Sequence, residues 1–308
     1  MSENGSKGDA RDFVVRNPLD ILQEYDTKMQ EILSIAAELS TTQDASKDSG
    51  LGLLQEKIKS ILSTPEFKSI IPEDVREYFE HDASGFRRRV LGFLQIIDRD
   101  LQRYVESDHT KIPDLSSHLS FVQKNWLKYR LVLEDLLLRT GVEAGVIVDR
   151  DKQRNTEELF LALNSELEDR CEKPSWGLEK EFIPSFEEIA KARVSVPLGV
   201  IFNFFQNCIS NATHPEIKAS KFKLKITLDT DNMVIEFWDN GKGMDENTKE
   251  KAFNKGFSAK NGKGLGLAGA PKRFTSYNAN VEVISNSNPN PGSDDWTTKF
   301  ILKAPIIK

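Results

Sequence analysis

Asp239-Asn240-Gly241-Lys242-Gly243-Met244 is the stretch that decides the fold of this 308-residue chain. The apolar residues 234–238 directly before it predict a strand that enters a core. Glycine permits positive φ and has no side chain, so a flat ligand or a phosphate can approach the backbone after this strand. We therefore expect the carboxylate of Asp239 at a fixed place beside bare main chain.

A second glycine-rich run follows downstream, Gly262-Lys263-Gly264-Leu265-Gly266-Leu267. Residues 265–274 predict the start of a helix directly at this run. The free N–H groups at a helix N-terminus bind phosphate oxygens, and the helix macrodipole adds to that attraction. One glycine-rich loop is weak support for a nucleotide site, whereas two loops joined to a third motif upstream are much stronger.

That third motif is a predicted helix over residues 197–211, in which asparagines recur every four residues at Asn203, Asn207 and Asn211. At this spacing the three side chains line one face of the helix. Amide oxygens are hard, neutral ligands suited to Mg²⁺ that already carries phosphate oxygens and water. The alternative is a polar stripe that faces solvent, a role for which Asn is a poor choice because of its low helix propensity.

Together with residues 252–260, these motifs resemble the N, G1, F and G2 boxes of the GHKL superfamily, which comprises gyrase, Hsp90, histidine kinases and MutL. Residues 255–267, KGFSAKNGKGLGL, resemble sensor histidine kinases most closely. The resemblance covers roughly residues 176–305. It implies a Bergerat fold, which is an α/β sandwich with a mixed sheet, and it implies ATP and Mg²⁺ as cofactors.

The resemblance also implies a role for each matching residue. Asn207 would coordinate Mg²⁺, and Asn203 would assist at the phosphates. Asp239 would accept a hydrogen bond from the adenine amino group, while Gly241 and Gly243 would let the base lie against the backbone. The remaining matches would belong to a mobile lid that closes on the phosphates, namely Phe253, Phe257, Lys260, Gly262, Gly264 and Gly266.

The N-terminal half predicts helices. Amphipathic periodicity predicts helices at 18–39 and 51–62, and apolar steps of three and four residues predict two longer ones at 72–107 and 114–139. Two such long helices cannot bury both of their seams alone, whereas two copies of the pair make a four-helix bundle. We therefore expect a homodimer.

His81 lies off this apolar seam and is followed by Asp82. Neutral imidazole is a nucleophile near neutral pH, and a neighbouring carboxylate can accept the proton of the other ring nitrogen. Residues 81–97 resemble the H-box of histidine kinases, which implies His81 as the phosphoacceptor and Asp82 as its general base. The alternative is a surface His-Asp pair without a role.

The expected fold class is α+β, with three regions. Residues 1–70 form a helical region of unknown role, residues 71–142 form the phosphotransfer hairpin, and residues 143–308 form the ATP-binding domain. Within the last region we expect a helix at 156–171 and further strands at 177–184, 222–228, 281–284 and 297–302.

Composition excludes several classes of partner and site. The formal net charge of −6 and the pI near 5.5 argue against nucleic acid and anionic membranes as partners. No apolar run is long enough to span a bilayer, which predicts a cytoplasmic protein without an integral membrane segment. The two cysteines, Cys171 and Cys208, lack metal-ligand spacing, and Cys208 is expected to be a buried thiol.

The function implied by the whole pattern is that of an ATP-dependent histidine kinase. It would phosphorylate His81 and pass the phosphoryl group to an aspartate on the receiver domain of a response regulator. Two alternatives stay open. One is a GHKL kinase that acts on serine, like the anti-sigma-factor or mitochondrial dehydrogenase kinases. The other is a binding module whose shape ATP switches without phosphoryl transfer.

Overall fold

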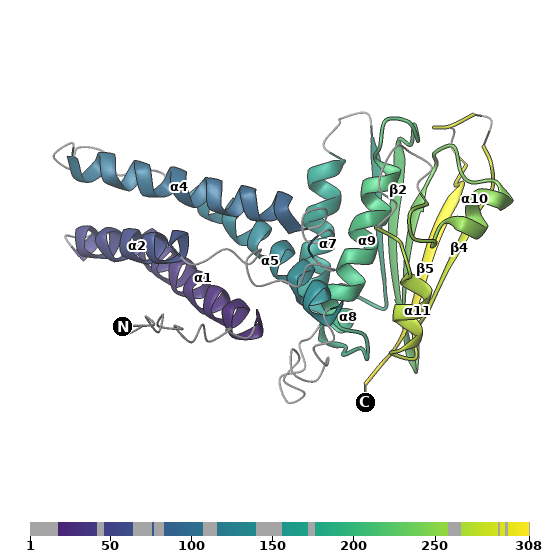
Figure 1. Cartoon of the computed structure of the whole chain (residues 1–308), viewed down its shortest axis with the longest axis horizontal. Helices are drawn as coiled ribbons and strands as arrows, with labels where there is room; N and C mark the ends of the chain where they lie inside the picture. Colours follow the sequence, from purple (N-terminus) through teal and green to yellow (C-terminus); the bar gives the residue numbers. More distant parts are fainter. Residues whose placement is uncertain are drawn as a thin grey trace, which may run out of the picture.

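The structure, a computed structural model, describes residues 18–41, 46–63, 76, 83–106, 116–139, 156–171, 176–257, 266–288, 290–292 and 295–307. Figure 1 shows a helical part, drawn in purple and blue, and a part built on a β-sheet, drawn in green and yellow. The two parts meet where helix α5 packs against helix α9. This arrangement confirms the α+β class.

The helical part is a four-helix bundle within a single chain. Its members are α1 (Pro18–Thr41), α2 (Ser46–Leu62), α4 (Ser84–Glu106) and α5 (Ser116–Arg139). Within the bundle, α1 packs on α2 and α5, and α4 packs on α5 and α2. The predicted helices at 18–39, 51–62 and 114–139 are confirmed within a few residues, and the one predicted at 72–107 is described as a regular helix from Ser84 onward.

The apolar seams of α4 and α5 are buried inside this bundle. On α4 the buried seam residues include Phe86, Val90, Ile97 and Leu101. On α5 they are Val122, Trp126, Tyr129, Leu133 and Leu136. The predicted bundle consisted of two copies of the hairpin of α4 and α5, whereas here α1 and α2 of the same chain cover these seams, so a second copy is not needed to cover them. A dimer built on this arrangement must use another surface.

The other part is a two-layer sandwich on a five-stranded sheet. The strands are β1 (Gly177–Ile183), β2 (Lys221–Leu228), β3 (Asn232–Asp239), β4 (Asn280–Ser285) and β5 (Thr298–Pro305), and their order is β1-β2-β3-β5-β4. β1 runs parallel to β2, and the other neighbours are antiparallel, so the sheet is mixed as predicted. All four strands expected at the sequence level, and the one ending at Asp239, are present.

Helices cover one face of the sheet. They are α7 (Glu157–Arg170), α8 (Phe186–Lys191), α9 (Leu198–Ala212) and the short α11 (Ala270–Thr275), while α10 (Glu246–Lys251) buries no residue. Phe204 of α9 packs edge-on against Phe274 and Phe300. The opposite face carries charged pairs, such as Lys299 with Glu236 at 2.5 Å. Only the helix-covered face therefore holds an apolar core, which explains the alternating burial along β2 and β3.

Gly199 sets the close approach of α9 to α5. A Cβ at this position would stand 2.2 Å from the carbonyl oxygen of Leu131 and 2.9 Å from the backbone nitrogen of Asp135. Because backbone atoms cannot move aside cheaply, we expect Gly199→Ala to lower the free energy of unfolding by about 1–3 kcal/mol in urea denaturation. The matched control is Gly92→Ala in α4, where an added Cβ meets nothing within 4 Å. That change should stabilise by about 0.5–1 kcal/mol, and equal stability of the two variants would contradict the tight packing.

Candidate functional site

The asparagine pair lies inside the molecule at the centre of the site. Asn203 and Asn207 are both buried, whereas Asn211, one turn further on, is exposed. Nδ2 of Asn207 donates to the backbone oxygen of Asn203 at 2.8 Å and to its Oδ1 at 3.0 Å. The alternative of a solvent-facing stripe is therefore wrong for the first two asparagines.

Gly266 of the second glycine-rich run lies against Asn207. A Cβ at Gly266 would stand 2.2 Å from Oδ1 of Asn207. The backbone of this run thus approaches the amide oxygen directly, which only glycine allows. The structure brings together the two sequence motifs that were predicted to meet at the metal and phosphates.

Asp239 ends strand β3 beneath a tight turn and is 3% exposed. Its Oδ1 accepts a hydrogen bond from the backbone N–H of Gly241 at 2.9 Å. Its backbone oxygen accepts from Thr297, both from the N–H at 2.9 Å and from the hydroxyl at 3.2 Å. The carboxylate is therefore held by its own turn, and the backbone of Asp239 is held by the chain that enters β5.

Both glycines after Asp239 are required by their surroundings. A Cβ at Gly241 would stand 2.3 Å from the side chain of Ile217, and one at Gly243 would stand 1.8 Å from the backbone oxygen of Asn286. Gly243 also has a φ of +67°, which L-residues rarely adopt. Both glycines are therefore required because other parts of the protein pack against them, and a ligand beside this backbone stays a prediction.

Asn240, between these residues, has a structural role that the sequence analysis did not assign. It is fully buried, and its Oδ1 accepts from the backbone N–H groups of Ser220 and Lys221 at 2.9 and 2.8 Å. The turn after β3 is thereby tied to the start of β2. The motif thus positions its acidic residue through the asparagine that follows it.

Cys208 lies close to this turn and is fully buried, as predicted. Burial raises the pKa of its thiol well above the ordinary value, and the negative charge of Asp239 raises it further. The thiol is therefore protonated at neutral pH and unsuited to nucleophilic chemistry.

The two ends of the predicted lid are joined by a hydrogen bond. The N–H of Gly269 donates to the backbone oxygen of Phe253 at 2.9 Å, and Phe253 packs partly buried against the core. Phe257 is half-buried, while Lys260, Gly262 and Gly264 lie outside the described residues. His81 and Asp82 lie outside them as well.

The helix predicted to begin at Leu265 begins later. α11 starts at Ala270, after Gly269, whose φ of +67° breaks the helical conformation. Residues 266–269 are bends and turns, so Gly266 and Leu267, the described end of the second glycine-rich run, precede the helix.

A buried acid from the bundle completes the site and was missed from the sequence. Asp135 of α5 accepts a hydrogen bond from Nδ2 of Asn203 at 2.6 Å, and it is paired with Arg139 and with Arg273 of α11. The sequence did carry a signal, because Glu134 and Asp135 interrupt the leucine-rich run 131–138. An acid in such a run has to find a polar partner when it is buried.

Comparison with known families supports this geometry. Residues 199–307 match the family described as histidine kinase-, DNA gyrase B-, and HSP90-like ATPase. They form a GHKL ATPase domain. The match starts at the tight α5–α9 contact and ends with strand β5, so it includes the asparagine pair, the Asp239 turn and both ends of the lid.

Solved structures similar to the chain include histidine kinases at low identity. The mycobacterial sensor histidine kinase MprB is 17% identical over 49% of this chain and 95% of its own, with a TM-score of 0.37. The catalytic domain of the histidine kinase ThkA is 23% identical over 49% and 94%, with a TM-score of 0.39. Full-length ShkA in complex with AMPPNP is 17% identical over 77% and 46%, with a TM-score of 0.42. The assignment of the domain is based on the family match over residues 199–307.

Among proteins of curated function, none matches the sequence. In the parts of the chain that the structure describes, no helix combines the length and the apolar character needed to cross a membrane.

The residues of the GHKL domain suit a metal ion whose other ligands come from a bound nucleotide and water. Within the described ranges, no group of three or more His, Cys, Asp or Glu side chains could hold a metal ion by itself. The amide oxygen of Asn207, beside the bare backbone of Gly266, offers one neutral oxygen ligand. One such ligand suits Mg²⁺ whose other ligands are phosphate oxygens and water.

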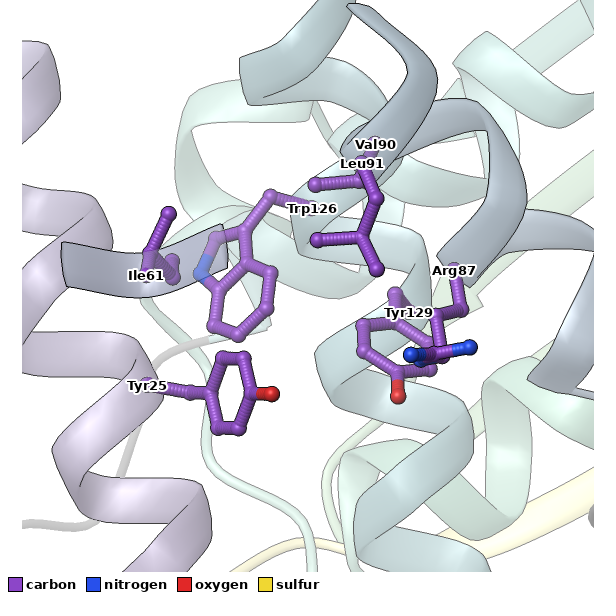
Figure 2. A pocket seen from close by; sticks show the side chains of 7 residues that line it. All are labelled: Tyr25, Ile61, Arg87, Val90, Leu91, Trp126 and Tyr129. Carbon is purple, nitrogen blue, oxygen red and sulfur yellow. The ribbon is translucent and has the colours of Figure 1, made fainter. Parts of the chain in front are cut away.

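A separate hollow lies in the bundle, away from the GHKL domain (Figure 2). Apolar and aromatic side chains and one guanidinium line it: Tyr25, Ile61, Arg87, Val90, Leu91, Trp126 and Tyr129. Figure 2 shows Tyr25 and Trp126 close together on one side, and their rings stack at 6.3 Å. The enclosed space holds roughly one water molecule, so this hollow is too small to be the nucleotide site.

Proposed function

We propose that this chain is an ATP-dependent protein-histidine kinase that phosphorylates His81. The observation that carries the proposal is the contact of Gly266 with Asn207 in a GHKL ATPase domain that also holds the Asp239 turn. The phosphoryl group would then pass to an aspartate on the receiver domain of a response regulator.

Each motif has a role in this proposal. Asn207 would hold Mg²⁺ and Asp239 would accept from the adenine amino group, with Gly241 and Gly243 beneath the base. The lid residues would close on the phosphates: Phe253, Phe257, Lys260, Gly262, Gly264 and Gly266. The bound Mg-ATP supplies the phosphoryl group and neutralises its charge. Positioning and electrostatic stabilisation by the protein account for most catalysis of this kind.

His81 and Asp82 would carry the chemistry on the protein side. One imidazole nitrogen of His81 attacks the γ-phosphorus, the bond from that phosphorus to the bridging oxygen breaks, and ADP leaves. Asp82 accepts the hydrogen bond, and with it the proton, of the other ring nitrogen. In this proposal residues 71–142 would be the phosphotransfer region, between a helical region at 1–70 and the ATP-binding domain at 143–308.

A homodimer and a cytoplasmic location belong to the same proposal. ATP and receiver domains are found together in the cytoplasm. The seams of α4 and α5 are covered by α1 and α2 of the same chain, so a homodimer would form through other surfaces.

The test is incubation of wild type and His81→Gln with γ-labelled ATP and Mg²⁺, followed by acid and alkali treatment of the labelled protein. We expect acid-labile, alkali-stable label in the wild type and loss of nearly all label in the variant, because a phosphoramidate is hydrolysed in acid. Addition of a receiver domain should then move the label to it.

Two results would contradict the proposal. Label that persists in His81→Gln and survives acid would favour the serine-kinase alternative. Tight nucleotide binding without any labelled protein would favour the module that ATP merely switches.

A further inference from the structure

A continuous series of buried hydrogen bonds runs from the bundle to the metal-binding asparagine. Asp135 of α5 accepts from Nδ2 of Asn203 at 2.6 Å, and Oδ1 of Asn203 accepts from Nδ2 of Asn207 at 3.0 Å. Asp135 and Asn203 are both fully buried. The series thus crosses from the helical bundle into the GHKL domain without passing through the surface.

The order of donors and acceptors fixes the orientation of both amides. An ionised carboxylate can only accept hydrogen bonds, so the Asn203 atom that faces Asp135 must be Nδ2. Oδ1 of Asn203 then faces Asn207, whose Nδ2 must donate the hydrogen bond to it. Oδ1 of Asn207 is left on the side of Gly266, where a metal ligand is needed.

Two arginines keep Asp135 ionised. Arg273 lies 2.8 Å and Arg139 lies 2.8 Å from its oxygens. Burial by itself would raise the pKa of this carboxyl group, but Arg273, Arg139 and the Asn203 hydrogen bond outweigh burial and lower the pKa below its ordinary value. At neutral pH the carboxylate of Asp135 therefore accepts hydrogen bonds and donates none, as the series requires.

We propose that Asp135 is a positioning residue for the metal site, which orients the amide of Asn207 through Asn203. The inference rests on the proposed binding of Mg-ATP in the GHKL domain. It also revises the expected role of Asn203, whose amide is used inside the protein and orients Asn207 instead of contacting phosphate. Because Asp135 belongs to α5, displacement of this helix relative to α9 would disturb the metal ligand.

The test separates the metal from the rest of the nucleotide site. Calorimetry measures binding of an ATP analogue with a non-hydrolysable β–γ linkage to the full chain, once with excess Mg²⁺ and once with EDTA. The quantity compared is the Kd in EDTA divided by the Kd in Mg²⁺, which measures how much the metal strengthens binding. Asp135→Leu has a similar shape and no acceptor, and its two arginines can turn toward solvent, since their side chains are 12% and 21% exposed. We expect the ratio to fall by about tenfold, as for other outer-shell partners of metal ligands.

Two further variants distinguish a specific effect on the metal site from a general loss of stability. Asn203→Leu breaks the series while leaving Asp135 with both arginines, and it should reduce the ratio in the same way. Lys128→Met, on the same helix, removes a different buried charge and should lower stability without changing the ratio.

The outcomes distinguish the inference from the proposed function. A wild type that binds no nucleotide overturns both. A wild type with metal-dependent binding, whose Kd ratio is unchanged in Asp135→Leu or in Asn203→Leu, overturns this inference alone. A ratio that falls equally in Lys128→Met also overturns it, because general destabilisation would then explain the effect.

Discussion

Replacement of Asp239 by Asn is expected to weaken ATP binding by about 10- to 100-fold without unfolding the protein. Asn keeps an oxygen that can accept the bond from the Gly241 N–H, which measures 2.9 Å in the wild type. Its Nδ2 then occupies the second carboxylate position. An amide donor there faces the donor of the adenine amino group, so the favourable contact becomes an unfavourable one.

Calorimetric titration with ATP and with GTP measures this effect. Guanine has a carbonyl oxygen where adenine has its amino group, so Asp239→Asn should lose less affinity for GTP than for ATP. The control is Asp245→Asn, at the end of the same loop. There the exposed side chain caps α10 through the Thr248 N–H, and Asn is an equally good cap. Unchanged ATP affinity in Asp239→Asn, or an equal loss in both variants, would contradict the role assigned to Asp239.

Lys128→Met is expected to be the most destabilising of the changes considered, at about 3–5 kcal/mol in the free energy of unfolding. Lys128 of α5 is fully buried, and its ammonium lies 3.1 Å from Glu166 and 2.5 Å from Asp169, both on α7. Glu166 is itself buried. Removal of the cation leaves this carboxylate with Arg170 alone, at the contact between the bundle and the sandwich.

Urea denaturation at several pH values checks this prediction. Burial tends to raise the pKa of Glu166, but Arg170 and Lys128 outweigh it, so the pKa lies below its ordinary value of 4.5. A lowered pKa adds stability above pH 4.5, and this stability is lost as the pH falls through the folded-state pKa. The difference between wild type and Lys128→Met should therefore shrink in acid. Lys124→Met, exposed one turn earlier on the same helix, should change stability by less than about 0.5 kcal/mol, and a loss as large as that of Lys128→Met would contradict the account.

The features predicted correctly from the sequence are those with local physical causes. The patterns of apolar residues in the sequence predicted the strands, and close packing against other parts of the protein explains why Gly241, Gly243 and Gly266 are glycines. The start of α11 was predicted wrongly because the apolar pattern from Leu265 overrode one local signal. That signal is Gly269, which adopts a positive φ, so the helix begins only at Ala270.

Contacts between distant segments could not be predicted in this way. Periodicity showed that the seams of α4 and α5 need a cover, but it could not show that α1 and α2 provide it. Likewise, Asp135 and Asn203 are far apart in sequence, and only the packing of α5 against α9 makes them neighbours. Any movement of the bundle relative to the ATP-binding domain would therefore disturb this contact.

The most direct test of the central claim is localisation of the phosphate by tandem mass spectrometry, after incubation of the full chain with Mg-ATP and digestion in alkaline buffer. The account predicts a single phosphorylated residue, His81, and no phosphopeptide after a brief acid treatment. A phosphate found on serine or on another histidine, with His81 unmodified, would contradict it.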